Sequence, residues 1–190
     1  MLLLTGAAIG LLLGLATRGS LRPFASVRIA WPMLLLLLVA LAIKELGIFG
    51  PLAGSDLTPW LFSISNLGLI IWTIWHRHQL RGVELVGLGI ALNLVVVASN
   101  SGHMPVDPAL AHQGPPGLLR HGVWGQYILA DSTTRLNWLG DWIQLPPPIN
   151  RLFPEAYSPG DLVSWVGLAV VLFLLTHARA PAREGAITIP

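Results

Sequence analysis

The sequence predicts an all-α fold: a polytopic membrane bundle of five transmembrane helices beneath a partly helical outer cap. The first observation behind this prediction is composition. Of 190 residues, 54% are hydrophobic and 11% are charged, and the mean hydropathy is +0.68. Ordinary soluble domains carry about 25% charged residues, and a domain of this length could not bury so much apolar surface. These values exclude disorder and most soluble classes. They also exclude nucleic-acid binding. The isoelectric point is high, but so few charges set it that the net charge is only +2, which does not indicate a nucleic-acid partner.

The second observation is the length of the apolar stretches. A bilayer core about 30 Å thick needs roughly 20 apolar helical residues, with about 17 tolerated. Five stretches meet or nearly meet this length: 1–17, 30–49, 59–75, 83–99 and 159–177. Charged residues, glycine or proline follow each of them and end an apolar helix. A signal peptide over residues 1–17 is the competing interpretation, and it lacks the basic residues that would precede the apolar run. We therefore expect one membrane domain over residues 1–190.

The arginines indicate the orientation. Segments 18–29, 76–82 and 178–190 hold seven of the basic residues, whereas the opposite connections hold more acidic than basic side chains. Because the positive side of a membrane protein is cytoplasmic, we expect the N-terminus and segment 100–158 outside a bacterial inner membrane. The C-terminus is then cytoplasmic.

Segment 100–158 is the predicted outer cap. It contains eight of the fifteen prolines, and it is too rich in Leu, Trp and Ile for a flexible linker. Apolar residues at helical spacing predict two interfacial helices, Leu118–Ala130 and Leu136–Ile143. Gly122 and Gly125 weaken the first of these by about 1 kcal/mol each relative to alanine.

Three sequence blocks stand at the borders of this cap. They are Asn100-Ser101-Gly102-His103-Met104-Pro105-Val106, Leu139-Gly140-Asp141 and Ser158-Pro159-Gly160-Asp161. Their order resembles a family of small bacterial membrane proteins, known as domain of unknown function five-three-one-seven, whose first block reads Asn-Gly-Gly-x-Met-Pro-Val. Ser101 departs from the second glycine of that block. The resemblance implies a multi-pass bacterial membrane protein and no settled activity.

Each block has a structural interpretation and a functional alternative. Ser158 is expected to cap a helix that begins at Pro159, with Asp161 reaching back to a free N–H. Asn100 and Gly102 are suited to a left-handed turn that ends the preceding helix. The functional alternative is an outer-face polar cluster that binds a cation or a polar headgroup. Its candidate members are Asn100, His103, Asp107, Asp141, Asp161 and Lys44.

Polar and small residues inside the spans suggest helix contacts. Lys44 is expected either to snorkel to the outer surface or to pair with Asp141 or Asp161. Asn66 and Asn93 are predicted at similar depth, where they either join helices by hydrogen bonds or line a polar cavity. A small-residue face allows close contact either within the chain or with a partner subunit. That face consists of Gly6, Gly10 and Gly14.

No catalytic signature is present in the sequence. Cysteine is absent, which excludes disulfides and thiolate chemistry. The spacing of His103, His112 and His121 fits no usual ligand pair, so no metal or other cofactor is predicted. The favoured function is therefore a non-enzymatic ligand- or lipid-binding protein, or an accessory subunit of a membrane complex.

Two alternatives stay open. One is a membrane-embedded enzyme that acts on lipid at the outer leaflet, and it requires His103, Asp107 and Asp141 to meet in one pocket. The other is a small transporter.

Overall fold

Five α-helices make up just over half of the residues that the structure describes. The computed structural model describes residues 2–48, 52, 55–110 and 123–178. The helices are α1 (Leu2–Ala16), α2 (Trp31–Ile48), α3 (Thr58–His76), α4 (Val83–Ser99) and α5 (Pro159–Thr176). Their ends lie within a residue of the five predicted apolar stretches. The mostly helical class is therefore confirmed.

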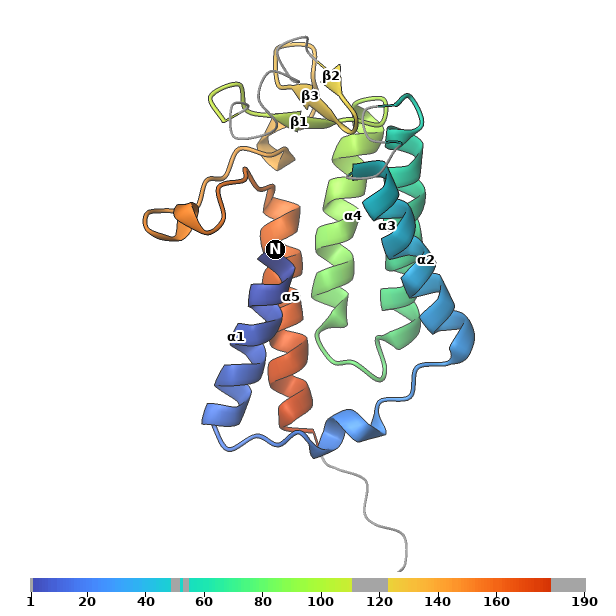
Figure 1. Cartoon of the computed structure of the whole chain (residues 1–190), viewed down its shortest axis with the longest axis vertical. Helices are drawn as coiled ribbons and strands as arrows, with labels where there is room; N and C mark the ends of the chain where they lie inside the picture. The colour runs from blue at the N-terminus through green and yellow to red at the C-terminus, as the bar shows by residue number, and fades with distance from the viewer. Residues whose placement is uncertain (1, 49–51, 53–54, 111–122, 179–190) are drawn as a thin grey trace, which may run out of the picture.

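The helices stand side by side in a row (Figure 1). The main contacts join α1 to α5, α5 to α4, α4 to α3 and α3 to α2, so the spatial order is α1–α5–α4–α3–α2. Helices that follow one another in the sequence run in opposite directions, so the neighbours α1 and α5 run in the same direction. Among the described helices, α5 is the one both long and apolar enough to cross a membrane by length and composition, and 28% of its span is buried. Shorter apolar helical segments are Leu3–Ala16, Trp31–Lys44 and Val83–Ser99.

The small-residue face of α1 lies against α5. Gly10 approaches the α5 backbone so closely that an added Cβ would overlap the carbonyl of Ala169, while Gly6 meets Trp165 and Gly14 meets Thr176. The Trp165 indole also donates to the Thr5 hydroxyl at 3.1 Å. Of the two roles predicted for these glycines, this is the intramolecular one, and α5 occupies the face that a partner subunit would have used.

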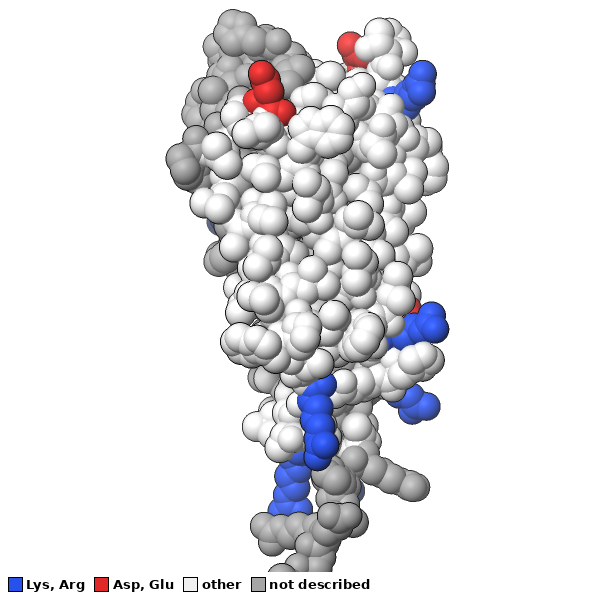
Figure 2. Space-filling view, turned by 90° about the vertical axis from the view of Figure 1, so that its right-hand side faces the viewer, with Lys and Arg blue, Asp and Glu red and all other residues white. Residues whose placement is uncertain are grey.

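One end of the row, the base, carries arginines. A short 3-10 helix, η1 (Arg22–Ser26), leads from α1 to α2 there and contacts α5. Figure 2 shows basic side chains gathered at this end, acidic side chains mostly at the other, and a broad uncharged band between them. The described basic residues in the base connections are Arg18, Arg22, Arg28, Arg77 and Arg81.

The opposite end carries the cap, which contains a small β-sheet. Its strands are β1 (Met104–Val106), β2 (Val123–Trp124) and β3 (Tyr127–Leu129), in the order β1-β3-β2. Strand β3 pairs in parallel with β1 and antiparallel with β2. Two single-turn 3-10 helices, η4 (Asn137–Leu139) and η5 (Ile149–Arg151), follow.

The prediction of two interfacial helices in the cap is wrong for the residues that the structure describes. Gly125 adopts φ +55° in a two-residue turn between β2 and β3, which makes this stretch a hairpin. Leu136, with φ +56°, prevents a helix from starting there, and only the single turn of η4 follows. Residues 118–122 of the first prediction lie outside the described residues.

The cap packs against the ends of α3 and α4. Its apolar contact is a cluster of buried side chains, comprising Phe62, Val96, Val97, Met104 and Leu139. Because η4 and β1 both contact α4, the cap is packed against the row of helices.

Candidate functional site

The junction between α4 and the cap is built by Asn100. Its side-chain amide donates to the Arg135 carbonyl at 2.8 Å, and its oxygen accepts the Arg135 N–H at 2.7 Å. The chain then passes through Ser101 (φ +55°) and Gly102 (φ +94°) into β1. The predicted left-handed turn is therefore confirmed, with Asn100 as the helix C-cap and the left-handed residues after it.

The start of α5 is fixed by a second polar cluster. Ser158 accepts the backbone N–H of Asp161, and Asp161 accepts the backbone N–H of Ser158, so the predicted helix cap is confirmed. Asn93 of α4 joins this pair. Its amide donates to Asp161 Oδ1, and its oxygen accepts the Ser158 hydroxyl, both at 2.8 Å. The polar groups of Asn93 and Asp161 are thus used to join α4 to α5.

Asn66, like Asn93, is a buried amide, but it lies on α3. It is 2% exposed on α3, and its side-chain nitrogen has no hydrogen-bond partner among the described residues. Asn93 is instead paired with α5. The two amides at similar predicted depth therefore have different environments.

Asp141 is a buried carboxyl in the cap. Its backbone bridges to β1, donating to Pro105 at 2.8 Å and accepting from Asp107 at 2.9 Å. Its Oδ1 has no hydrogen-bond partner in the described part of the chain. Burial raises the pKa of this carboxyl well above its ordinary value, and the charges of Asp161 and Glu155 raise it further. Burial and the nearby Asp141 also raise the pKa of the Tyr127 phenol.

Lys44 is not among the charges that act on Asp141. Its ammonium lies 5.5 Å from the centroid of the Phe62 ring, which joins α2 to α3. Of the two roles expected for this lysine, the charge pair with Asp141 or Asp161 is not formed among the described residues.

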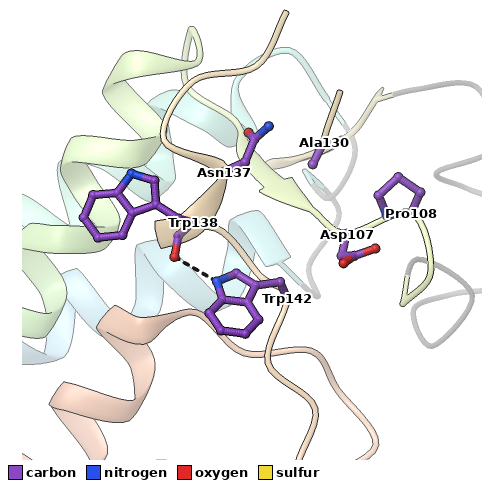
Figure 3. Close-up of a pocket in the computed structure, with 6 residues that line it drawn as sticks. All are labelled: Asp107, Pro108, Ala130, Asn137, Trp138 and Trp142. Carbon is purple, nitrogen blue, oxygen red and sulfur yellow. Dashed lines mark hydrogen bonds between the residues drawn. The ribbon is translucent and has the colours of Figure 1, made fainter. Parts of the chain in front are cut away.

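A pocket of about 280 Å³ opens on the cap (Figure 3). It lies between the end of β1 and η4, and its lining residues are Asp107, Pro108, Ala130, Asn137, Trp138 and Trp142. The Trp142 indole donates to the Trp138 carbonyl at 2.8 Å, which holds its ring in place. Asp107 Oδ1 accepts the backbone N–H of Ala109 at 2.8 Å.

The predicted polar cluster is therefore divided among several places. Asp107 is its one member that lines the pocket. Asn100 and Asp161 hold helix ends, and His103 lies half-buried in the turn before β1. Asn137 and Trp142 line the pocket without having been candidates. Only the folding of residues 107–142 brings them next to Asp107, and no local pattern indicates this.

His76 is expected from the sequence to be a polar residue at the inner membrane interface, whereas the structure buries its side chain. It is 1% exposed near the base, stacks on Trp72 at 4.2 Å between ring centroids, and donates from Nδ1 to the Trp72 carbonyl. Within the described residues, no group of three or more His, Cys, Asp or Glu side chains could hold a metal ion. His112 and His121 lie outside the described residues.

Comparison with known proteins identifies a family without a known activity. The model of a family described as "Family of unknown function (DUF5317)" matches residues 24–173. No curated protein and no solved structure matches the chain.

Proposed function

We propose, for a chain that belongs to the family of unknown function DUF5317, that its five helices cross the bacterial inner membrane and carry a ligand- or lipid-binding cap on the outer side. The protein has no catalytic role in this proposal. The observation that carries it is the apolar row of helices, with a broad uncharged band on the face that Figure 2 shows, between a basic base and a folded cap.

The exposure of the helices supports a lipid environment. Helix α5 has a neighbouring helix on either side, and yet only 28% of its span is buried. A core helix of a soluble protein is mostly covered. Large apolar side chains are also exposed along the other helices, among them Leu4, Leu12, Leu38, Ile64 and Ile74. Exposed apolar surface of this extent requires an apolar partner, and lipid chains meet that need for every helix in the row.

The helix lengths fit a membrane crossing with local thinning of the bilayer. At about 1.5 Å per residue, helices of 15 to 19 residues span roughly 22–28 Å. A short helix is accommodated at a modest cost in free energy per ångström of mismatch.

The charge distribution supports the orientation. The described arginines of the base belong on the cytoplasmic side, which puts the N-terminus and the cap outside. The exposed Trp138 and Trp142 of the cap then lie near the outer headgroups, where indole rings are favoured.

The pocket favours binding over catalysis. The enzyme alternative needs His103, Asp107 and Asp141 to converge, yet Asp107 alone of these lines the pocket. The hydrogen bonds of Asn93, Asn100 and Asp161 serve helix ends, as in a structural scaffold. A scaffold that carries a small pocket supports a binding or accessory role.

Extraction of membranes tests this proposal. After expression in bacteria, the chain should stay in the membrane pellet through an alkaline carbonate wash and enter solution only with detergent. A peripheral protein in the same membranes serves as the control for the wash. Release of the chain by carbonate alone would contradict the membrane assignment. Native mass spectrometry of the detergent-purified chain then tests for binding, because a bound lipid or small molecule is expected to remain attached.

A further inference from the structure

We infer that the cap pocket binds a primary ammonium group, carried either by an amine-bearing lipid headgroup or by a small soluble amine. This inference rests on the proposed function and names the ligand class of the pocket. It comes from the polar groups of the lining, their electrostatics, and the size and position of the pocket.

The pocket offers hydrogen-bond acceptors, and two of its side-chain donor groups, the Asn137 amide and the Trp142 indole, already donate to backbone carbonyls. Asp107 uses Oδ1 to accept from Ala109, and its Oδ2 has no partner among the described residues. The amide of Asn137 donates to the Asp131 carbonyl at 3.0 Å. The Trp142 indole N–H is used by the Trp138 carbonyl. A ligand with N–H donors therefore complements the acceptor oxygen that Asp107 presents.

The electrostatics of the lining favour a cation. Among the lining residues that the structure describes, none is Lys, Arg or His, and Asp107 is the one charged side chain. The Asn137 Oδ1 is buried without a hydrogen-bond donor in the described part of the chain, so its dipole adds negative potential to the wall. The ring of Trp142 has a negative π face that attracts cations. A phosphate or carboxylate would be repelled by the Asp107 carboxylate.

A primary ammonium fits better than a quaternary one. The free oxygen of Asp107 can accept a charge-assisted hydrogen bond from an ammonium N–H. A quaternary ammonium has no N–H to donate, and only the π face and the charge would attract it. The expected order of affinity is therefore ethanolamine above tetramethylammonium.

The size and position of the pocket suit a headgroup. Its volume of about 280 Å³ lies just below the range of drug-sized sites, roughly 300–1,000 Å³. Trp138 is 66% exposed, and η4, which carries it, contacts α4. In the proposed orientation, this places the pocket near the level of the outer lipid headgroups, where both a lipid amine and a soluble amine have access.

The test compares two substitutions that remove the same charge from the full chain in mild detergent. Asp107→Asn removes the carboxylate and keeps an acceptor for the Ala109 N–H. Asp56→Asn, the matched control, removes an exposed carboxylate that does not line the pocket. One arm measures phosphatidylethanolamine against phosphatidylcholine retained in native mass spectra from equal mixtures. The other arm measures ethanolamine and tetramethylammonium binding by calorimetry.

The expected result is that Asp107→Asn weakens amine binding about tenfold, the effect of one charge-assisted hydrogen bond, while Asp56→Asn binds like the unaltered chain. Asp107-dependent enrichment of phosphatidylethanolamine supports the inference and assigns the lipid source. Asp107-dependent ethanolamine binding without that enrichment supports it and assigns a soluble amine. Equal binding by all three proteins, or an equal loss in both variants, would overturn it.

Trp142→Leu provides a second variant that leaves Asp107 and its turn in place. Severalfold weaker binding of ethanolamine or phosphatidylethanolamine is expected, because the π face is lost. Unchanged binding of both ligands would overturn the inference. The carbonate wash does not depend on this pocket, so failure of the inference and failure of the membrane proposal give different results.

Discussion

Ser101 holds a left-handed backbone conformation that costs an L-residue roughly 1–2 kcal/mol. Glycine occupies the equivalent position in the sequence block that the chain resembles. Replacing Ser101 with Gly should therefore stabilise the fold by about 0.5–1 kcal/mol, measured as a higher midpoint of thermal unfolding in detergent.

Gly102→Ala is the control with the opposite sign. Gly102 also has positive φ, and an added Cβ would lie 2.5 Å from the Pro59 Cβ. This variant should unfold at a lower temperature. If Ser101→Gly instead lowers the midpoint, the Ser101 side chain stabilises the turn and the strain argument is wrong.

The two side-chain hydrogen bonds of Asn93 are predicted to stabilise the contact between α4 and α5. Asn93→Ala leaves Ser158 and Asp161 without their shared partner, so stability should fall by about 1–3 kcal/mol. Asn66→Ala is the matched control, because the Asn66 nitrogen has no partner in the described part of the chain. Equal losses in the two variants would contradict the role of the Asn93 contacts.

Asp141 should make the stability of the cap depend on pH. Its pKa is raised in the folded state above the ordinary value of 3.8, so the folded state binds more protons than the unfolded state. The contribution of this residue is fully present below pH 3.8 and is lost as the pH rises through the folded pKa. The midpoint of unfolding should accordingly fall over this range in the unaltered chain.

Asp141→Asn removes the titrating group and should flatten that part of the pH profile. Thermal unfolding of the full chain at a series of pH values measures both profiles. Identical slopes in the two proteins would show that other groups dominate.

At the scale of elements, the contact of α1 with α5 depends on small residues. Gly10 leaves no room for a side chain against the Ala169 carbonyl. Gly10→Leu should separate the two helices and destabilise the protein by about 1–3 kcal/mol, as overpacking does.

Leu13→Val is the control on the same helix, since Leu13 is exposed. It should change the unfolding midpoint little. Unchanged stability in Gly10→Leu would mean that α1 does not pack on α5 through this face.

The helices could be predicted from the sequence because a long apolar helix is defined by local properties. Apolar length and the residues that stop each run placed all five helices within a residue of their observed ends. The capping box of Ser158 and Asp161 is similarly local, because its partners lie three residues apart.

The cap could not be predicted in the same way. Leucine and tryptophan at helical spacing favoured a helix over Leu118–Ala130, yet Tyr127 pairs with Met104, more than twenty residues earlier in the chain. Such non-local pairing leaves no periodic signal in a segment of three residues. The pocket could not be predicted for the same reason, because Asp107 and Trp142 line it together although they lie far apart in the sequence.

The molecule as a whole has a basic base, an apolar row of helices and a cap that contains a buried carboxyl and the pocket beside Asp107. Each layer has a consistent explanation if the bilayer surrounds the row. The base then faces the cytoplasm, and the pocket faces the outer leaflet, where an amine-bearing ligand can reach Asp107. The central claim is therefore that the cap and the base lie on opposite sides of one membrane.

Because the chain has no cysteine, single cysteines report its topology directly. Ser132→Cys places a thiol on an exposed turn of the cap, and Gln79→Cys places one in the exposed connection between α3 and α4 at the base. In spheroplasts, a membrane-impermeant maleimide should label Cys at position 132 at once and Cys at position 79 only after permeabilisation. Labelling of both positions from outside, or of position 79 alone, would contradict the account.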